Sequence, residues 1–503
     1  MINAKPLIIS RTLPHLGGRE RIVQSLINYF KKDGLIVVTP DELKPETGVT
    51  VVAYKEDESL WDDMIGQLEQ YDFNVIHCHT FYLADFAIKA AAYFKVPLVF
   101  TLHGVFFDFY GDKYNSIIKR IADNSTIFAT VSDQYRRVLQ EFVGDESDIE
   151  YVPNGIAIET ENEESIDRFN EEETIVAVPA RFTKLKGLEY LIEALPLLKA
   201  GIQVHVCSPA GRKVEEEIRF KNDLLSKIST TNVYFHEFDN DRWMSFLKKA
   251  DIVLLPSLIE GQSLALLEAM SQEKLVVATN VGGSPEIISH GINGFIIEPK
   301  SPCAIAETLE FIIDLDESAR EKMRNNASQT VSENFSFEKM VHAYISLYEK
   351  AILKKQKTPK DVQAVIVKNL QDPEFLVLKR LNKNSGIYEF RLVKGGIKKT
   401  EDAEGALTRE ITEETGVQKS TILSALEPYS YSYFLKRVYV THNVSTYLVE
   451  AVSAEDYSKV NQAEEGGFDI DSILWLTIGD IVSTLTYPQE QDLAMQAIQY
   501  LGK

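Results

Sequence analysis

The stretch GGIKKTEDAEGALTREITEETGV, residues 395–417, decides the fold of the last third of the chain. Within it, Glu410, Glu413 and Glu414 stand at positions i, i+3 and i+4, so a helix would place all three carboxylates on one face. Crowded carboxylates raise one another's pKa, and a hard divalent cation with oxygen ligands relieves that repulsion. The spacing therefore predicts a helix that binds Mg²⁺ (or Mn²⁺) and that ends at Gly416.

The pattern extends to residues before the helix. Five residues separate Gly395 from Glu401, and seven more lead to Arg409. The whole pattern resembles the Nudix box, the signature of hydrolases that cleave a nucleoside diphosphate linked to another group. The resemblance implies that Glu401 and Arg409 pair to brace the loop against the helix. It also implies that Glu410, Glu413 and Glu414 hold the metal. Of these, Glu413 and Glu414 would also take part in catalysis. A solvated acidic helix face is the alternative, but it does not explain the spaced glycine and arginine.

The composition is that of an ordinary globular protein, with 503 residues, 45% hydrophobic and 25% charged. The formal net charge of -22 repels nucleic acid and anionic membranes at long range, so phosphate substrates would need local cations or a metal. Cys78, Cys207 and Cys303 are widely spaced, which favours a reducing compartment without a disulfide framework. The chain has no apolar run long enough for a transmembrane segment, and its first apolar stretch is too short for a signal peptide. We therefore expect a soluble cytoplasmic protein that binds no nucleic acid, with a weak peripheral membrane contact left open.

The first 350 or so residues alternate short apolar runs with amphipathic helical stretches. This βαβα order predicts two Rossmann-like α/β domains with parallel sheets, and the carboxyl ends of both sheets would face a shared cleft. The predicted strands of the first domain are Pro6–Ser10, Leu35–Val38, Val75–Cys78, Leu98–Leu102 and Ile127–Val131. Those of the second are Ile175–Pro179, Gln203–Cys207, Val233–His236, Ile252–Pro256 and Leu275–Thr279.

The order of elements changes after the second domain. Residues 160–173 form an acidic connector between the two α/β domains, and Phe335–Lys354 is one amphipathic helix. From Val362 onward, strands follow one another with little helix between them, which predicts an α+β domain. We expect domains at 1–165, 166–353 and 362–503, with a linker at 354–361.

Glycines and cations follow strands of both α/β domains. Gly17 and Gly18 lie between a strand and a helix, where the backbone can approach a ligand and the helix amides are free. Arg181 and Lys186 follow the first strand of the second domain, where they could neutralise a pyrophosphate.

A second loop carries two carboxylates. Glu260 and Gly261 follow a strand, and Ser263 can cap the next helix, whose amides would face a phosphate. Glu268 lies in the early turns of that helix, where its carboxylate could accept two ribose hydroxyls.

These motifs together resemble retaining glycosyltransferases of the GT-B fold, in the large family-four group that includes sucrose and glycogen synthase relatives. The resemblance covers roughly residues 5–350 and rests on Gly17-Gly18, His103, Asn154-Gly155, Arg181 with Lys186-Gly187, Glu260 and Glu268, Gly282-Gly283-Ser284-Pro285-Glu286 and Asn293-Gly294. It implies transfer of a sugar from a nucleoside diphosphate sugar to an acceptor on the first domain, with retention and without a required metal.

The resemblance also implies roles for single residues. Arg181 and Lys186 would neutralise the departing diphosphate, and Glu260 with the amides after it would hold the sugar hydroxyls. Glu268 would take the ribose, and His103 would lie beneath the sugar. The donor-binding set is Gly17, Gly18, Arg181, Lys186, Gly261, Ser263 and Glu268, and the catalytic set of this half is His103, Glu260, Arg181 and Lys186. The loop after Glu260 departs from the family pattern, because Gln262-Ser263 replaces the common Phe-Gly.

Three alternatives stay open beside a bifunctional transferase and Nudix hydrolase. The Nudix module could sense a nucleotide without hydrolysing it and regulate the transferase, or the GT-B half could be a scaffold. His77 and His79 stand at i, i+2 on one strand and could suggest zinc, although no other Cys/His cluster accompanies them. The donor sugar and base stay open, and the acceptor could be a small molecule, a glycan or a lipid-linked molecule.

Overall fold

The computed structural model describes residues 3–11, 17–40, 47–104, 107–144, 147–157, 173–210, 214–230, 232–238, 240–383, 385–435, 437–452 and 468–503. Most of the acidic connector predicted at 160–173, and the domain boundary placed within it, lie outside these residues. The chain divides into two compact units, Met1–Lys355 and Gln356–Lys503, and this boundary falls within the segment 354–361.

The first unit begins with a seven-stranded parallel sheet in the order β3-β2-β1-β4-β5-β6-β7. Its strands are β1 (Pro6–Ile9), β2 (Leu35–Thr39), β3 (Val49–Ala53), β4 (Val75–Cys78), β5 (Leu98–Leu102), β6 (Ile127–Thr130) and β7 (Ile149–Tyr151). The helices are α1 (Gly18–Phe30), α2 (Trp61–Gln67), α3 (Ala84–Phe94), α4 (Phe107–Asn124) and α5 (Asp133–Val143). The five central strands confirm the prediction. The two edge strands, β3 and β7, were missed because they are partly exposed and carry a weaker apolar signal.

A second parallel sheet follows in the order β10-β9-β8-β11-β12-β13. Its strands are β8 (Thr174–Pro179), β9 (Ile202–Pro209), β10 (Val233–Phe238), β11 (Ile252–Leu255), β12 (Leu275–Thr279) and β13 (Phe295–Ile297). The helices are α6 (Leu188–Ala194), α7 (Glu215–Lys227), α8 (Asn240–Lys249), α9 (Leu264–Ser271), α10 (Ser284–Ile287), α11 (Pro302–Asp314) and α12 (Glu317–Asn334). Each sheet has a separate hydrophobic core, so the first unit contains two Rossmann-like domains.

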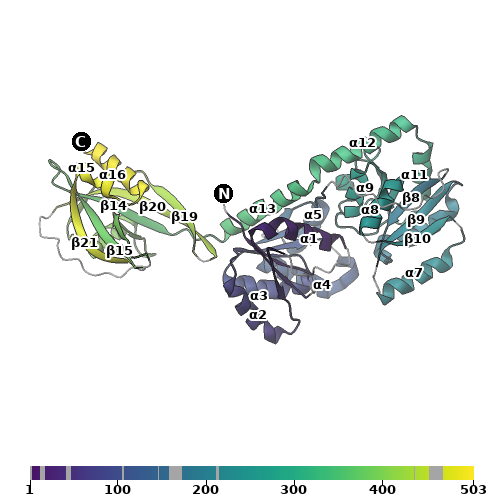
Figure 1. Cartoon of the computed structure of the whole chain (residues 1–503), viewed down its shortest axis with the longest axis horizontal. Coiled ribbons are helices and arrows are strands. Elements are labelled where there is room, and N and C mark those ends of the chain that lie inside the picture. Colours follow the sequence, from purple (N-terminus) through teal and green to yellow (C-terminus); the bar gives the residue numbers. More distant parts are fainter. Residues whose placement is uncertain are drawn as a thin grey trace. The chain divides into compact units, whose positions relative to one another are not determined.

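The chain then returns to the first domain through α13 (Phe337–Lys354), which is capped by Ser336 and packs against β4 and β5. In Figure 1, α12 and α13 are consecutive long helices. The chain crosses between the two domains twice, once after Ile156 and again at Phe335–Phe337. The two crossings are joined where the Ile156 amide donates to the Phe335 carbonyl at 3.0 Å and the Phe337 amide donates to the Ile156 carbonyl at 2.9 Å. A side chain at Gly155 would overlap the Ser336 carbonyl, so the two crossings lie in direct contact.

The second unit is an α+β domain, as predicted from Val362 onward. Its mixed sheet has the path β16-β15-β14-β20-β18, with β17 on β14, β19 on β20 and β21 on β15. Its strands are β14 (Lys360–Lys368), β15 (Glu374–Asn382), β16 (Tyr388–Arg391), β17 (Val393–Gly396), β18 (Ser420–Ala425), β19 (Tyr429–Leu435), β20 (Val438–Ala451) and β21 (Phe468–Thr477). The helices are α14 (Ala403–Thr415), α15 (Ile478–Thr484) and α16 (Pro488–Tyr500), and α15 and α16 lie side by side (Figure 1).

Among the helices in the described parts of the chain, none combines the length and apolarity needed to cross a bilayer.

Candidate active sites

The two Rossmann-like domains enclose a cavity of about 480 Å³. All the residues that the sequence predicts for this half of the chain line it: Gly17, Gly18, His103, Arg181, Lys186, Glu260, Gly261, Ser263 and Glu268. The cavity lies where parallel strands of both sheets end, which is the usual ligand position in open α/β sheets.

One wall of the cavity carries the two predicted cations. Lys186 closes a short 3₁₀ turn and forms an ion pair with Glu260, which also accepts a hydrogen bond from Ser257 Oγ at 2.8 Å. Gly187 follows with φ 63°, and a side chain there would overlap the Pro256 carbonyl, so only glycine fits this turn. Arg181 makes no ion pair with any described residue. Of the two predicted cations, Lys186 is therefore paired and Arg181 is available to a ligand.

The helix α9 supplies the predicted ribose ligand. Ser263 caps it as predicted, accepting from the Leu266 amide at 3.4 Å. Glu268 is buried, and both of its oxygens have partners: Arg21 forms an ion pair with Oε1, and Trp243 Nε1 donates to Oε2 at 2.9 Å. Neither partner was predicted from the sequence.

Several contacts hold the two domains together around the cavity. A side chain at Gly261 would overlap the His103 carbonyl, so the second domain packs directly on the first at this point. Glu286 accepts from Ser132 Oγ at 2.7 Å and from the Gln134 amide at 2.8 Å, which satisfies the N-terminal turn of α5.

The departure from the family pattern at Gln262 is one of these contacts. Its side-chain oxygen accepts from the Asn154 amide, and its carbonyl accepts from Asn154 Nδ2 at 3.0 Å. Gln262 therefore joins the loop after Glu260 to the first domain.

The first domain contributes histidines to the cavity. His79 Nδ1 lies 3.0 Å from His103 Nε2, and both rings line the cavity. Burial is the main reason that the pKa of His103 lies well below its usual value, and it lowers the pKa of His79 to about 3. Both imidazoles are therefore neutral at neutral pH.

The second candidate site is on α14 of the second unit. Asp402 caps this helix by accepting from the Gly405 amide at 2.8 Å, and Gly416 ends it with φ 77° as predicted. The predicted pairing of Glu401 with Arg409 is present, with Nη2–Oε1 and Nε–Oε2 distances of 2.7 and 3.1 Å. These hydrogen bonds lower the pKa of Glu401 to about 2.

Arginines neutralise the three predicted metal ligands. Arg409 Nη1 lies 2.6 Å from Glu410 and 3.1 Å from Glu413, while Arg380 forms an ion pair with Glu414. Arg380 was missed because the strand EFLVLKR signals only a buried run with a basic end. A side chain at Gly395 would overlap the Glu410 carboxyl group, which explains the glycine at this position.

The three carboxylates of α14 suit a hard divalent cation, because such a cation prefers carboxylate oxygens as ligands. Glu410 and Glu414 are buried, and Glu413 is half exposed, so metal could enter from the Glu413 side. In the arrangement described, no three His, Cys, Asp or Glu side chains among the described residues converge in metal-binding geometry. Arg409 and Arg380 would have to release the carboxylates on metal binding.

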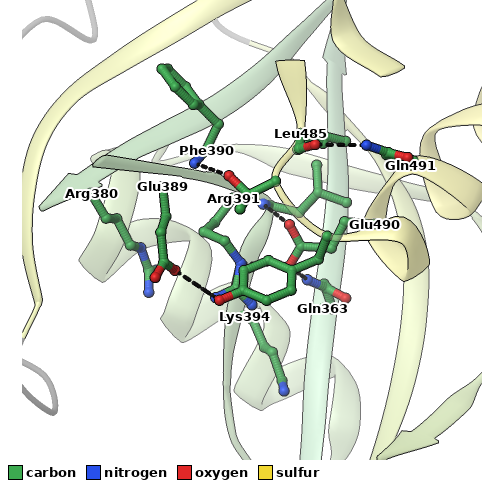
Figure 2. A network of polar contacts seen from close by, with 12 residues as sticks. Gln363, Arg380, Glu389, Phe390, Arg391, Lys394, Leu485, Glu490 and Gln491 are labelled. Atoms are coloured by element: carbon green, nitrogen blue, oxygen red, sulfur yellow. Dashed lines mark hydrogen bonds and ion pairs between the residues drawn. The ribbon is translucent and has the colours of Figure 1, made fainter. Parts of the chain in front are cut away.

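A buried polar network continues from this site toward α16 (Figure 2). Glu490 is 1% exposed and accepts from Gln363 Nε2 at 2.7 Å, Arg391 Nε at 3.0 Å and the Leu392 amide at 3.1 Å. Lys394 lies in the same network, and burial lowers its pKa. The sequence alone indicated none of these pairings.

The chain matches three family models: Glycosyltransferase Family 4 over residues 16–160, Glycosyl transferases group 1 over 159–330, and the NUDIX domain over 358–496. A curated relative, an uncharacterized glycosyltransferase of Methanocaldococcus jannaschii, is 28% identical over 57% of this chain and 78% of its own length. The N-acetyl-alpha-D-glucosaminyl L-malate synthase of Bacillus anthracis is 24% identical over 58% of this chain and 78% of its own length.

Solved structures share the fold of the first unit. The crystal structure of Anabaena HepE with UDP and glucose has a TM-score of 0.60 at 18% identity, covering 69% of this chain and 99% of that one. Sucrose-phosphate synthase of Thermosynechococcus elongatus has a TM-score of 0.59 at 16% identity, with the same coverage of both chains.

Proposed function

The chain joins the two domains of a family 4, group 1 glycosyltransferase of the GT-B fold to a NUDIX domain, and from this we propose a specific reaction for each part. The first unit moves a sugar from a nucleoside diphosphate sugar to an acceptor, with retention of anomeric configuration. The second unit hydrolyses a diphosphate-containing substrate with the help of Mg²⁺.

The cluster of Arg181, Lys186 and Glu268 in one cavity supports the transferase reaction best. A nucleoside diphosphate brings a ribose and two or more negative charges. Arg181 is available to the diphosphate, while Lys186 exchanges Glu260 for a phosphate oxygen when the donor binds. Fixed cations stabilise the charge that develops on the leaving group.

The released Glu260 then turns to the sugar hydroxyls, and His103 contacts the sugar from the first domain. Attack of the acceptor hydroxyl on the same face as the leaving group gives retention, and the departing phosphate takes the acceptor proton. The Anabaena neighbour was solved with UDP and glucose, so UDP-sugars are the first donors to test.

Protection of the full chain against thermal unfolding by a panel of nucleoside diphosphate sugars tests this proposal. A donor at about 100 times its Kd stabilises the protein by about 2.7 kcal/mol. Lys186→Met should lose this protection. Lys184→Met is the matched control, because Lys184 lies on the same turn, is exposed and does not line the cavity. Equal protection of both variants would contradict the role of Lys186.

The carboxylates of α14 support the hydrolase reaction. Glu410, Glu413 and Glu414 would hold the metal, which when bound supplies charge neutralisation for the diphosphate and lowers the pKa of a water ligand. Arg409 and Arg380, once released, are placed beside the same carboxylates and can bind phosphate oxygens.

Mg²⁺-dependent release of phosphate or a nucleotide by the full chain tests the hydrolase. Glu413→Gln should abolish it, whereas Glu404→Gln, an exposed change in the first turn of the same helix, should not. Nucleotide binding without turnover in the wild-type protein would instead indicate a sensing module.

A further inference from the structure

Three histidines of the first domain form a continuous group beside the cavity. His77 is the next-to-last residue of β4, and His79 directly follows that strand. His103 directly follows β5. The His77 and His79 rings lie 3.8 Å apart, and the His79 and His103 rings lie 5.3 Å apart at 29°. The i, i+2 spacing of the first two could suggest zinc.

His77 has a structural role that leaves no nitrogen for a metal. Its Nδ1 lies 2.7 Å from the Tyr348 hydroxyl on α13, and its Nε2 lies 2.8 Å from Thr101 Oγ1. Both nitrogens are therefore used within the protein, and the ring ties α13 to the sheet.

His79 differs from His77 because one of its nitrogens is unsatisfied. The side chain is 2% exposed, Nδ1 contacts His103 Nε2, and Nε2 is buried without a hydrogen-bond partner among the described residues. A buried polar atom without a partner costs free energy and calls for a reason. His79 also packs against the His77 and Tyr344 rings, but its one hydrogen-bonding contact among the described residues is with His103.

Two neutral imidazoles that share one hydrogen bond have linked tautomers. If His79 donates from Nδ1, His103 must carry its own proton on Nδ1. If His103 donates from Nε2, its Nδ1 becomes an acceptor. The partner of one ring nitrogen therefore decides what the other ring nitrogen offers to a ligand.

The unpartnered nitrogen of His79 favours the first of these states. A buried N–H group without an acceptor is rarer in proteins than a buried acceptor without a donor, so a lone pair on His79 Nε2 is preferred to an N–H group. His79 then carries its proton on Nδ1 and donates to His103.

We infer that His79 is a positioning residue that fixes the orientation and tautomer of His103, so that His103 presents a neutral Nδ1–H donor to a hydroxyl oxygen of the bound sugar. The hydroxyl as ligand rests on the proposed transferase function, whereas the coupling of the two rings does not. A neutral donor suits an uncharged hydroxyl, while the diphosphate is left to Arg181 and Lys186.

Long-range ¹H–¹⁵N spectra of the full chain with ¹⁵N-labelled histidine read the tautomers directly, and His79 and His103 variants assign the signals. We expect His103 to carry its proton on Nδ1 in the wild-type protein and to lose this single tautomer in His79→Leu. In His79→Asn the amide can replace Nδ1 of the imidazole as donor, so the His103 tautomer should be kept.

Kinetics should follow the spectra. His79→Leu should lower kcat/KM for transfer about tenfold, as expected for the loss of one oriented hydrogen bond. His79→Asn should recover most of that loss, and neither variant should weaken protection by the nucleoside diphosphate alone. Since a leucine could also disturb folding, the thermal midpoint of each variant is compared with that of the wild-type protein.

A wild-type His103 protonated on Nε2, or an unchanged tautomer in His79→Leu, would overturn the inference. So would equal kcat/KM losses for the leucine and asparagine variants when both are folded. If the tautomers behave as expected but no nucleoside diphosphate sugar binds, the proposed transferase reaction and the sugar ligand fail together, while the coupling of the rings is supported.

Discussion

Arg21 of the first domain forms an ion pair with Glu268 of the second domain, across the cavity that both line. Because Trp243 donates to the other oxygen of Glu268, both oxygens of the carboxylate proposed to bind the ribose already have a partner without a ligand. A ribose hydroxyl would share this carboxylate with Arg21 or replace it, so donor binding is linked to the contact between the domains.

Removing this cation should destabilise the protein without ligand. In Arg21→Met, the buried Glu268 carboxylate loses its charged partner, which costs about 1–3 kcal/mol, since Arg21 is partly exposed and loss of a fully buried partner costs more. We expect the thermal midpoint to fall by a few degrees, and protection by a nucleoside diphosphate to increase relative to the wild-type protein. The double variant Arg21→Met/Glu268→Gln is the control and should unfold at a higher temperature than Arg21→Met alone. Identical midpoints for all three proteins would show that the pair has no energetic role.

The glycines of the Nudix box offer a matched pair of substitutions. A side chain at Gly395 would overlap Glu410, whereas one at the next residue, Gly396, meets Asp361 Oδ1 only at 3.9 Å. Gly395→Ala should therefore displace Glu410, cost about 1–3 kcal/mol by overpacking and abolish Mg²⁺-dependent hydrolysis. Gly396→Ala should retain hydrolysis. Activity and denaturant unfolding of both variants check this. A Gly395→Ala enzyme that still hydrolyses its substrate would contradict the assignment of Glu410 as a metal ligand.

The Glu401–Arg409 pair should contribute a defined acid dependence. The folded-state pKa of Glu401 is lowered from 4.5 to about 2. The unfolded state therefore binds a proton first, so this contribution to stability is present above pH 4.5 and is lost as the pH falls toward 2. We expect Glu401→Gln to flatten the fall in stability of the second unit over this range. Unfolding midpoints measured at several pH values would show the effect, and parallel pH curves for variant and wild-type proteins would exclude it.

The network around Glu490 should be among the most sensitive sites of the second unit (Figure 2). Glu490→Leu would leave Gln363 Nε2 and the Leu392 amide without their acceptor and would leave Arg391 with Glu389 alone, which we expect to cost about 1–3 kcal/mol. Glu490→Gln keeps an acceptor oxygen and should cost less. Denaturant midpoints of the two variants give the comparison. A leucine variant as stable as the glutamine variant would show that the network only fills space.

Local patterns were sufficient for the parts of this fold that are buried and close in sequence. The apolar runs of β4, β5 and β12 were predicted with their observed ends, because strands covered on both faces read as continuous apolar segments. The edge strand β3 was missed because most of its residues are partly exposed. The box helix was predicted with its end at Gly416, since the spacing and the glycine both act within a few residues.

Pairings between distant residues could not be predicted in the same way. Arg21 and Glu268 are 247 positions apart, and nothing in the local sequence of either one indicates the other. The contact of His79 with His103 likewise depends on the order of β4 and β5 in the sheet, so the sequence showed only two histidines on one strand, for which zinc was an alternative without a supporting Cys/His cluster. Arg380 reaches Glu414 from a neighbouring strand that carries no sign of the box.

The paired backbone segments at Ile156 and Phe335–Phe337 determine how the transferase half can admit and release its ligands. The two hydrogen-bonded crossings define a hinge axis between the two Rossmann-like domains. Rotation about this axis keeps both hydrogen bonds, whereas translation of one domain away from the other breaks them. Any opening of the cavity that keeps these two hydrogen bonds is therefore expected to be a rotation of one domain about this line.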